Sequence, residues 1–182
     1  MVWDVFLSAI GVVIGYFAAL NYDRTKTQNA FLEAHKLSMN ALVSSLKRNS
    51  EYIHQMFTVE FPAGFYPSYP LDTVALALIN FGARPILPSN TEWPAKFNVL
   101  RFEMDHINRK LLLNFCSGDR IDPAYVKTTY DHYTATGQPP DVSSTHPLSK
   151  IFHLLLAAKT ALDEQVQELE RHGFRGECVK PY

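Results

Sequence analysis

Arginine and histidine lie close together twice in this sequence. Arg48 precedes His54 by six residues, with Asn49 directly after the arginine, and Arg101 precedes His106 by five residues. Arginine carries a permanent positive charge, and histidine exchanges a proton near neutral pH. These five residues are therefore the candidate catalytic residues of the chain. The alternative is that they are polar residues on the solvated or inter-helix faces of amphipathic helices.

Other catalytic and metal-binding signatures are missing from the sequence. It contains no glycine-rich phosphate loop, no nucleophile elbow, no HExxH motif and no EF-hand loop. The seven histidines form no pair at i,i+4 spacing, and Cys116 and Cys178 match no metal site, redox pair or disulfide framework. We expect no metal and no cofactor, and we expect both cysteines to be free thiols.

Composition sets broad limits on the function. The chain has 182 residues, of which 47% are hydrophobic and 19% are charged, as expected for one globular domain with an added apolar segment. The formal net charge of −1 provides no overall basic excess of the kind that nucleic-acid-binding proteins usually carry. RNA is therefore a partner only if one of the Arg–His pairs is catalytic.

An apolar segment precedes the part of the chain that carries these pairs. Val5 to Leu20 contains one polar side chain, Ser8, and the apolar run extends to Val2 and Tyr22. A helix of this length spans about 31 Å, close to the ~30 Å hydrocarbon thickness of a bilayer. The sequence therefore predicts a single transmembrane helix at residues 1–22. A cleaved signal peptide fits less well, because Met1 to Asp4 contains no Lys or Arg.

Charged residues that flank the apolar segment predict its orientation. The basic residues nearest the segment, Arg24, Lys26, Lys36 and Lys47, all follow it. By the positive-inside rule the N-terminus lies outside and the C-terminal domain lies in the cytoplasm. We therefore expect a single-pass protein of the cell's inner (cytoplasmic) membrane, with the lipid bilayer as its first partner.

Small residues form a stripe along the predicted transmembrane helix. Ser8, Gly11, Gly15 and Ala18 follow one another at intervals of three or four residues and include a GxxxG pair. Small side chains allow two helices in lipid to approach closely, so the stripe predicts homo-oligomerisation. The alternative is the ordinary abundance of glycine and alanine in membrane helices, because GxxxG alone is a weak signal.

Helical periodicity dominates the rest of the chain. We expect an all-α bundle at residues 23–174, made of three long and one or two short helices, followed by a tail at 175–182. The long helices are predicted at residues 23–57, 91–116 and 148–172, and the short ones at 73–81 and 122–133. Residues 61–70, FPAGFYPSYP, cannot form a helix; their aromatic side chains either cover one end of the core or dock a partner.

Apolar positions at steps of three and four residues predict which side of each long helix is buried. In the first helix these positions are Phe31, Ala34, Leu37 or Ser38, Ala41, Ser45 or Leu46, Asn49, Ile53 and Met56. In the second they are Phe97, Leu100, Met104, Ile107, Leu111 and Phe115. In the last they are Ile151, Leu155, Ala158, Leu162, Val166 and Leu169.

The Arg–His pairs resemble the motif of the HEPN ribonucleases, a family of helical bundles in which His follows Arg by four to six residues. Arg48-Asn-Ser-Glu-Tyr-Ile-His54 fits the motif with its polar Asn49, whereas Arg101-Phe-Glu-Met-Asp-His106 departs from it at Phe102. The resemblance implies that two chains pair so that their Arg and His residues converge. Arginine would then stabilise phosphate charge while histidine handles the 2′-hydroxyl proton.

The layout, an N-terminal span followed by a small helical bundle, also resembles membrane accessory proteins of bacterial antiviral systems. The nearest likeness is to the HEPN-like pore-forming partner of RNA-targeting CRISPR effectors. This resemblance implies a ring-shaped homo-oligomer whose anchors line a channel, with a non-catalytic HEPN site.

Three functional hypotheses follow from these observations. The leading one is a non-enzymatic, membrane-anchored module that homo-oligomerises and acts at the bilayer, as a pore-type antiviral effector or accessory. The alternatives are a membrane-anchored ribonuclease of HEPN type and a passive subunit or scaffold of a larger membrane complex, with a protein partner docked on residues 61–70.

Overall fold

The computed structural model describes residues 2–67, 69–77, 93–118, 120–142, 146 and 148–176. Within the helices, the side chains of residues 2–13, 94 and 117 lie outside the described part. All regular secondary structure in these ranges is helical, and they contain no strand. The all-α class predicted from the sequence is therefore confirmed.

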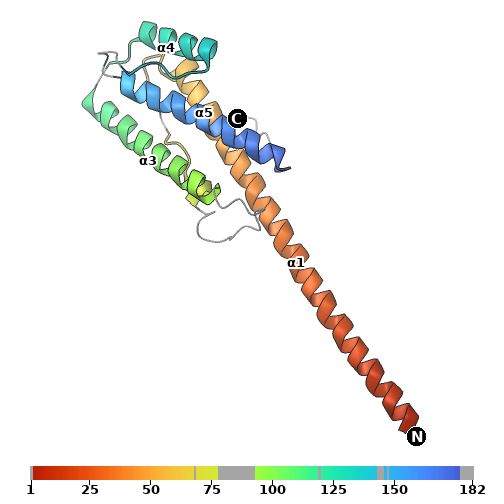
Figure 1. Ribbon diagram of the computed structural model, residues 1–182. Helices are drawn as coiled ribbons and strands as arrows, with labels where there is room; N and C mark the ends of the chain where they lie inside the picture. Colours follow the sequence, from red (N-terminus) through yellow and green to blue (C-terminus); the bar gives the residue numbers. More distant parts are fainter. Residues whose placement is uncertain are drawn as a thin grey trace. The chain divides into compact units, whose positions relative to one another are not determined.

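Three long helices account for most of the described chain. Helix α1 spans Val2–Gln55 and continues into a π-helical turn, η1, at Met56–Glu60. The other long helices are α3, Trp93–Ser117, and α5, Ser149–Arg171 (Figure 1). The shorter helix α4 spans Pro123–Thr136, and residues 74–77 are also helical. These elements match the predicted number of long and short helices.

The chain divides into two compact units, Met1–Ser38 and Met39–Tyr182. The first unit consists of the N-terminal part of α1, and the second contains the remainder of α1 with all later elements. Among the described residues, we find no helix that combines the length and the apolar character needed to cross a membrane. The first half of the predicted span, with Ser8 and Gly11, has its side chains outside the described part. The transmembrane segment therefore stays a prediction.

Helix α1 ends shortly before the first proline and glycine that follow Asp23 in the sequence. No proline or glycine occurs between Asp23 and Phe57, and then Pro62, which has no N–H donor, and Gly64, with φ of 78°, follow within a few residues. The last turn widens, because the N–H of Phe61 donates to the carbonyl of Met56 at 2.8 Å, an i→i+5 bond.

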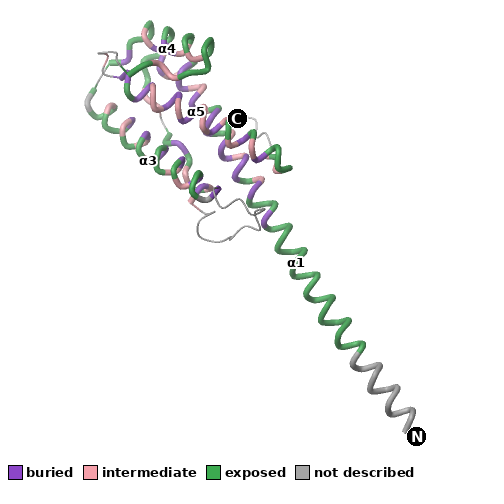
Figure 2. The backbone as a smooth tube through the Cα atoms, in the orientation of Figure 1, coloured by how far each residue is buried: buried purple, intermediate pink, exposed green. Residues whose placement is uncertain are grey.

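The hydrophobic core lies in the second unit and joins α1, η1, α3 and α5. Apolar residues of each long helix are almost fully buried there. Figure 2 shows the buried stretches of these helices in purple. All six core positions predicted for the last helix are buried, and so are five of the six predicted for the second. The exception is Phe115, which is exposed; it lies near the end of α3, and its ring stands edge-on to Tyr66 at a centroid distance of 6.0 Å.

The prediction for the first half of α1 was wrong. Phe31, Ala34, Leu37 or Ser38, and Ala41 were expected on the core face, and all five are exposed. The buried apolar residues of α1 begin at Met39 and continue with Leu42, Val43 and Leu46. Met39 and Leu42 are covered in place of Leu37 and Ala41. The later predicted positions of this helix are confirmed, because all of them are buried: Ser45, Leu46, Asn49, Ile53 and Met56.

Aromatic rings close one end of the core. Phe57 lies 5.2 Å from Phe152 and 5.3 Å from both Phe61 and Tyr130, measured between ring centroids. Phe61 is therefore part of the core, as one interpretation of residues 61–70 predicted. Phe65 and Tyr69 of the same segment are 68% and 73% exposed. Tyr66 is partly buried and also packs against the core. The segment thus covers the core with Phe61 and Tyr66 and presents Phe65 and Tyr69 to the surface.

Local sequence signals set the ends of α4. Asp122 is the N-cap residue and accepts from the N–H of Ala124 at 3.0 Å, Pro123 begins the helix, and Gly137 ends it in the left-handed conformation at φ of 69°. The start is confirmed, and the helix continues beyond the predicted end at Tyr133 to Thr136.

Candidate functional site

Arg48 lies on the exposed side of α1, and its side chain is 60% exposed. Its nearest charged partner is the carboxylate of Asp72, at 3.9 Å between Nη2 and Oδ2. An ion pair this long and this exposed contributes little to stability. Arg48 is therefore accessible to a ligand, but it faces the segment that contains Asp72.

Asn49 is buried and serves as a structural clamp. Its amide Nδ2 donates to the carbonyl of Asp72 at 2.8 Å, and its Oδ1 accepts from the N–H of Asp72 at 2.8 Å. Asp72 in turn accepts from Ser45 Oγ at 3.2 Å and from the N–H of Val74 at 2.9 Å. The last bond satisfies a backbone N–H at the start of the helical residues 74–77, and Asn49 attaches Asp72 to α1.

His54 points toward a different element. Its Nδ1 lies 2.5 Å from the hydroxyl of Tyr130 on α4, and the two rings are tilted at a centroid distance of 5.8 Å. Six residues along an α-helix correspond to about 9 Å of rise and about 120° of rotation, so Arg48 and His54 diverge. Within one chain the structure does not bring this pair together.

The second pair lies on α3. Arg101 Nε is 3.8 Å from Asp105 Oδ2, and its guanidinium carbon lies 5.9 Å from the ring centroid of Phe102. His106 is exposed. Among the described residues, no recorded polar contact joins Arg101 to His106. The observed arrangement is a charged outer face on α3, opposite the buried Leu100, Met104 and Ile107.

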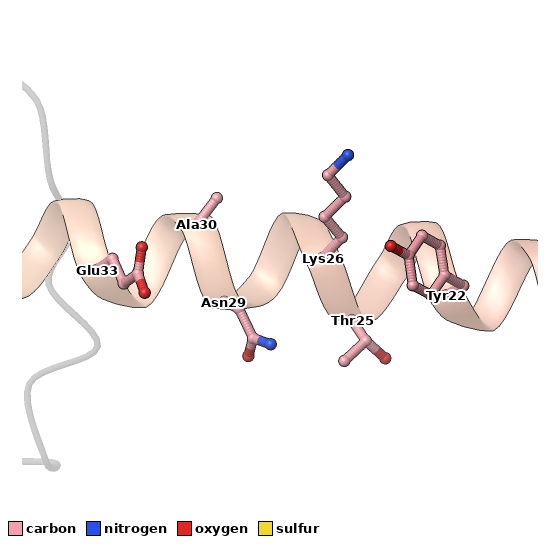
Figure 3. A pocket seen from close by; sticks show the side chains of 6 residues that line it. All are labelled: Tyr22, Thr25, Lys26, Asn29, Ala30 and Glu33. Atoms are coloured by element: carbon pink, nitrogen blue, oxygen red, sulfur yellow. The ribbon is translucent and has the colours of Figure 1, made fainter.

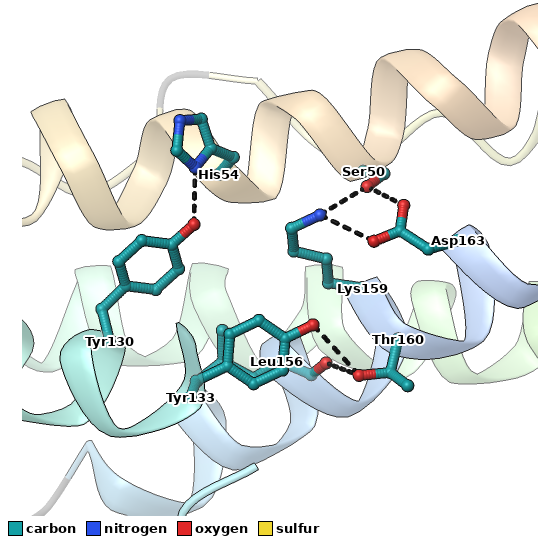
Figure 4. A network of polar contacts seen from close by, with 8 residues as sticks. All are labelled: Ser50, His54, Tyr130, Tyr133, Leu156, Lys159, Thr160 and Asp163. Atoms are coloured by element: carbon teal, nitrogen blue, oxygen red, sulfur yellow. Dashed lines mark hydrogen bonds and ion pairs between the residues drawn. The ribbon is translucent and has the colours of Figure 1, made fainter. Parts of the chain in front are cut away.

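A polar seam that includes His54 runs between α1 and the helices α4 and α5 (Figure 4). Lys159 donates from Nζ to Ser50 Oγ at 2.9 Å and to Asp163 Oδ2 at 2.8 Å, and Ser50 donates to Asp163 Oδ1 at 2.5 Å. Nearby, Tyr133 Oη and Thr160 Oγ1 are 3.1 Å apart. We call Ser50, His54, Tyr130, Lys159 and Asp163 the α1 seam.

Electrostatics keep the phenol of the seam protonated. Burial raises the pKa of Tyr130 above its usual 10.0, and the neighbouring Tyr133, Glu51 and Asp163 raise it further. The phenol of Tyr130 and Nδ1 of His54 share one hydrogen bond, and which of the two donates depends on the tautomer of the ring. The contact fixes the orientation of the His54 ring against α4.

The chemistry available to Ser50 is limited by its surroundings. A serine beside a lysine is a known nucleophile pair, but Ser50 is 6% exposed and gives its proton to Asp163. A buried lysine needs a carboxylate to offset its desolvation, and Asp163 is that carboxylate. The Ser50–Lys159–Asp163 group is therefore best explained as a contact that fixes α5 against α1.

Sequence reasoning missed Ser50, Tyr130, Lys159 and Asp163. Lys159 and Asp163 stand at i,i+4 on a predicted helix, which is a detectable signal for an ion pair. Their contact with Ser50 joins residues more than a hundred positions apart, so only the packing of the helices reveals it.

The predicted oligomer stripe is described for two of its four residues. Gly15 and Ala18 are exposed, and a Cβ added at Gly15 would meet no atom within 4 Å. Further along α1, Tyr22, Thr25, Lys26, Asn29, Ala30 and Glu33 line a hollow of about 340 Å³ (Figure 3). These residues all belong to one helix, so the hollow has no opposing wall and does not form a binding site by itself.

Among the described residues, no group of three or more His, Cys, Asp or Glu side chains is placed to hold a metal ion. Comparison of the chain with protein families, with curated proteins and with solved structures finds no match.

Proposed function

We propose that this protein is a non-enzymatic, single-pass membrane protein that homo-oligomerises through its N-terminal helix and acts at the bilayer, as a pore-type antiviral effector or accessory. The observation that carries the proposal is the uncovered apolar surface of α1. Ile14 and Phe17 are 62% and 60% exposed, and every residue from 14 to 34 is exposed. Large apolar side chains that stay uncovered mark a surface for lipid or protein.

The sequence around this surface supports contact with a membrane rather than with water. The apolar run continues N-terminal to Ile14 as far as Val2, and basic residues follow it at Arg24 and Lys26. Tyr22 lies between the two, where an amphipathic ring meets the headgroup region. The proposed orientation places the helical bundle in the cytoplasm.

Self-association is supported by the small-residue stripe. Gly15 presents a bare backbone surface with no neighbouring atom of its own chain near its Cβ position. If two helices approach closely at Gly11 and Gly15, this surface is buried between them. In lipid, such packing rather than the hydrophobic effect drives the association of helices.

The test is the subunit number of the full-length protein in nanodiscs. We expect an oligomer that Gly11→Leu and Gly15→Leu weaken by at least about tenfold in dissociation constant, since the added side chains separate the helices. Ala9→Leu adds comparable bulk on another face of the same helix and should leave the oligomer intact. A monomeric wild type, or equal effects of all three variants, would contradict the proposal.

One observation favours the ribonuclease alternative. His54 Nδ1 is held by Tyr130, which would orient Nε2 for proton transfer. The alternative requires that RNA cleavage by the purified protein is lost in a His54→Ala, His106→Ala double variant. Intact RNA with the wild type, or cleavage that survives in the double variant, eliminates it.

A further inference from the structure

The chain turns back toward α1 after the end of α5. Helix α5 ends at Arg171, and Gly173 follows in the left-handed conformation at φ of 88°. The N–H of Phe174 donates to the carbonyl of Leu169 at 3.1 Å, and the N–H of Gly173 donates to the carbonyl of Glu170 at 3.0 Å. This pair of bonds is a Schellman motif, which fixes the direction in which the chain leaves the helix. We call residues 172–176 the C-terminal strap.

Two rings of the C-terminal strap pack against Trp93, which is 1% exposed. The ring centroids of His172 and Phe174 lie 4.9 and 6.5 Å from that of Trp93, and both rings stand edge-on to it. Phe174 is partly buried against the core. The surroundings of Trp93 therefore report whether the strap is in place.

The next two residues of the strap lie against α1. The N–H of Arg175 donates to Oδ1 of Asn40 at 3.0 Å. Gly176 approaches so closely that an added Cβ would lie 2.7 Å from the backbone nitrogen of Ser44 and 3.0 Å from its Cα. The φ of Gly176 is not positive, so its own backbone conformation does not require glycine. The close approach to α1 is what excludes a side chain at this position.

These contacts extend the packing of α5 on α1 beyond the end of α5. Ser50 donates to Asp163, and Lys47 pairs with Glu170 at 2.6 Å, so the contacts move toward the N-terminus of α1 as α5 nears its end. The strap continues this order by contacting the two turns of α1 that precede Lys47. The buried apolar residues of α1 begin at Met39. The strap therefore lies at the first packed turns of α1.

Few contacts hold the strap in place. His172, Gly173 and Arg175 are exposed, and Phe174 and Gly176 are only partly buried. The hydrogen bond from Arg175 to α1 is itself exposed to solvent. Segments with little buried surface and exposed backbone hydrogen bonds open at a lower free energy than the rest of a protein.

We propose that the C-terminal strap is a conformational device that closes over the first packed turns of α1 and opens while the helical bundle stays folded. The closed strap covers Trp93 and holds the turns from Met39 to Ser44, and the open strap uncovers both. Every contact of the strap lies within the unit Met39–Tyr182. The inference therefore goes beyond the proposed function and does not depend on it.

Gly176→Val tests the close approach, because the added side chain would overlap the backbone of Ser44 and hold the strap open. Amide hydrogen exchange of the full-length protein in detergent measures the result. We expect residues 40–46 to exchange at least about tenfold faster than in wild type, while residues 100–111 of α3 keep their wild-type rates. Unchanged rates at residues 40–46 would overturn the inference. Equal acceleration in α3 would also overturn it, because the bundle would then open as a whole.

Arg175→Ala is the matched control for Gly176→Val. It replaces the exposed side chain next to Gly176 but keeps the N–H that donates to Asn40. Wild-type exchange rates at residues 40–46 are expected. Acceleration as large as that in Gly176→Val would mean that any change in this segment has the same effect, which contradicts a role for the close approach.

The hydrogen bond to α1 is tested at its acceptor. Asn40→Val removes the acceptor with little change in helix propensity, and Asn40→Asp keeps an acceptor oxygen at the same position. Loss of one net hydrogen bond should raise the exchange rates of residues 41–46 about two- to tenfold in Asn40→Val, and Asn40→Asp should restore the wild-type rates. Equal rates in Asn40→Val and wild type would contradict the inference.

Fluorescence tests whether the strap also leaves Trp93. The chain has two tryptophans, so a Trp3→Phe background isolates the signal of Trp93. Gly176→Val should raise the acrylamide quenching constant at least about twofold, because the rings of His172 and Phe174 withdraw, and Arg175→Ala should match the parent. Equal quenching in Gly176→Val and the parent would overturn the inference. A monomeric wild type in nanodiscs would contradict the proposed function and leave all of these results unchanged, so the two proposals fail separately.

Discussion

Two regions of the same helix, α1, have opposite surroundings. Every residue from Ile14 to Ala34 is exposed, whereas from Met39 to Gln55 one face of the helix is buried in the core (Figure 2). Both regions are helical, and neither contains a proline. The difference shows that secondary structure alone does not identify which part of a helix is stabilised by tertiary packing.

The two regions of α1 differ in what stabilises their helical structure. The later region buries Leu42, Val43, Leu46 and Ile53 against other helices, and such burial contributes most of a helix's stability in a globular protein. The earlier region buries no such residues between 14 and 34, so its helix depends on intrinsic propensity or on surroundings outside the chain. The proposed membrane would supply those surroundings for residues 14–22.

The largest expected effect comes from matched leucines in the two regions. Leu46→Ala removes a side chain with no exposed surface and should lower the unfolding free energy by about 3 kcal/mol, through lost burial and the cavity it leaves. Leu32→Ala, at a position that is 48% exposed, should change it by less than about 0.5 kcal/mol. Denaturant unfolding in detergent measures both, and similar losses would mean that residue 32 is covered in the folded protein.

A smaller contrast separates the neighbours Arg48 and Asn49. Asn49→Ala removes two buried hydrogen bonds to the backbone of Asp72 and should cost about 2 kcal/mol of unfolding free energy. Arg48→Ala removes a long, exposed ion pair and should cost less than about 0.5 kcal/mol. If the resemblance to HEPN motifs reflects activity, Arg48→Ala should instead abolish RNA cleavage while the protein stays folded. That result would identify Arg48 as an active-site residue.

The positions of the helices were predicted from the sequence more accurately than the question of which residues pack against a neighbouring element. Asp122, Pro123 and Gly137 are local signals, because each acts through its own backbone geometry, and they located α4 closely. The six core positions of α5 were also correct, since its apolar residues occupy one face and its other faces are polar. Phe31 and Leu37 follow the same spacing but are exposed. Periodicity indicates which residues could face a neighbour, but it does not establish that a neighbour exists.

The candidate site was predictable only in its individual residues. The proximity of Arg48 to Asp72 and of His54 to Tyr130 depends on where α4 and the segment before α3 pack, which no local pattern encodes. The Arg–His spacing therefore indicated a possible pair, whereas the structure gives each residue a different partner.

The smallest expected effect concerns Glu60, at the end of the packed region of α1 and η1. One oxygen of its carboxylate, Oε2, is buried and has no hydrogen-bond partner among the described residues, and burial raises the pKa of this carboxyl above 4.5. The folded protein therefore favours the protonated form. Stability from this group is fully present below the unfolded-state pKa and is lost as the pH rises through the raised folded-state pKa.

Glu60→Gln removes this ionisation and should make the protein more stable at neutral pH, by roughly a few tenths of a kcal/mol because water screens a partly exposed carboxylate. The gain over wild type should shrink toward zero as the pH falls below the unfolded-state pKa. Glu164→Gln, at an exposed position of α5, is the control and should show no such trend. Unfolding curves across pH 4 to 7 measure the difference between each variant and wild type. A gain that stays constant with pH would mean that the amide packs better than the carboxyl and that the buried charge is not the cause.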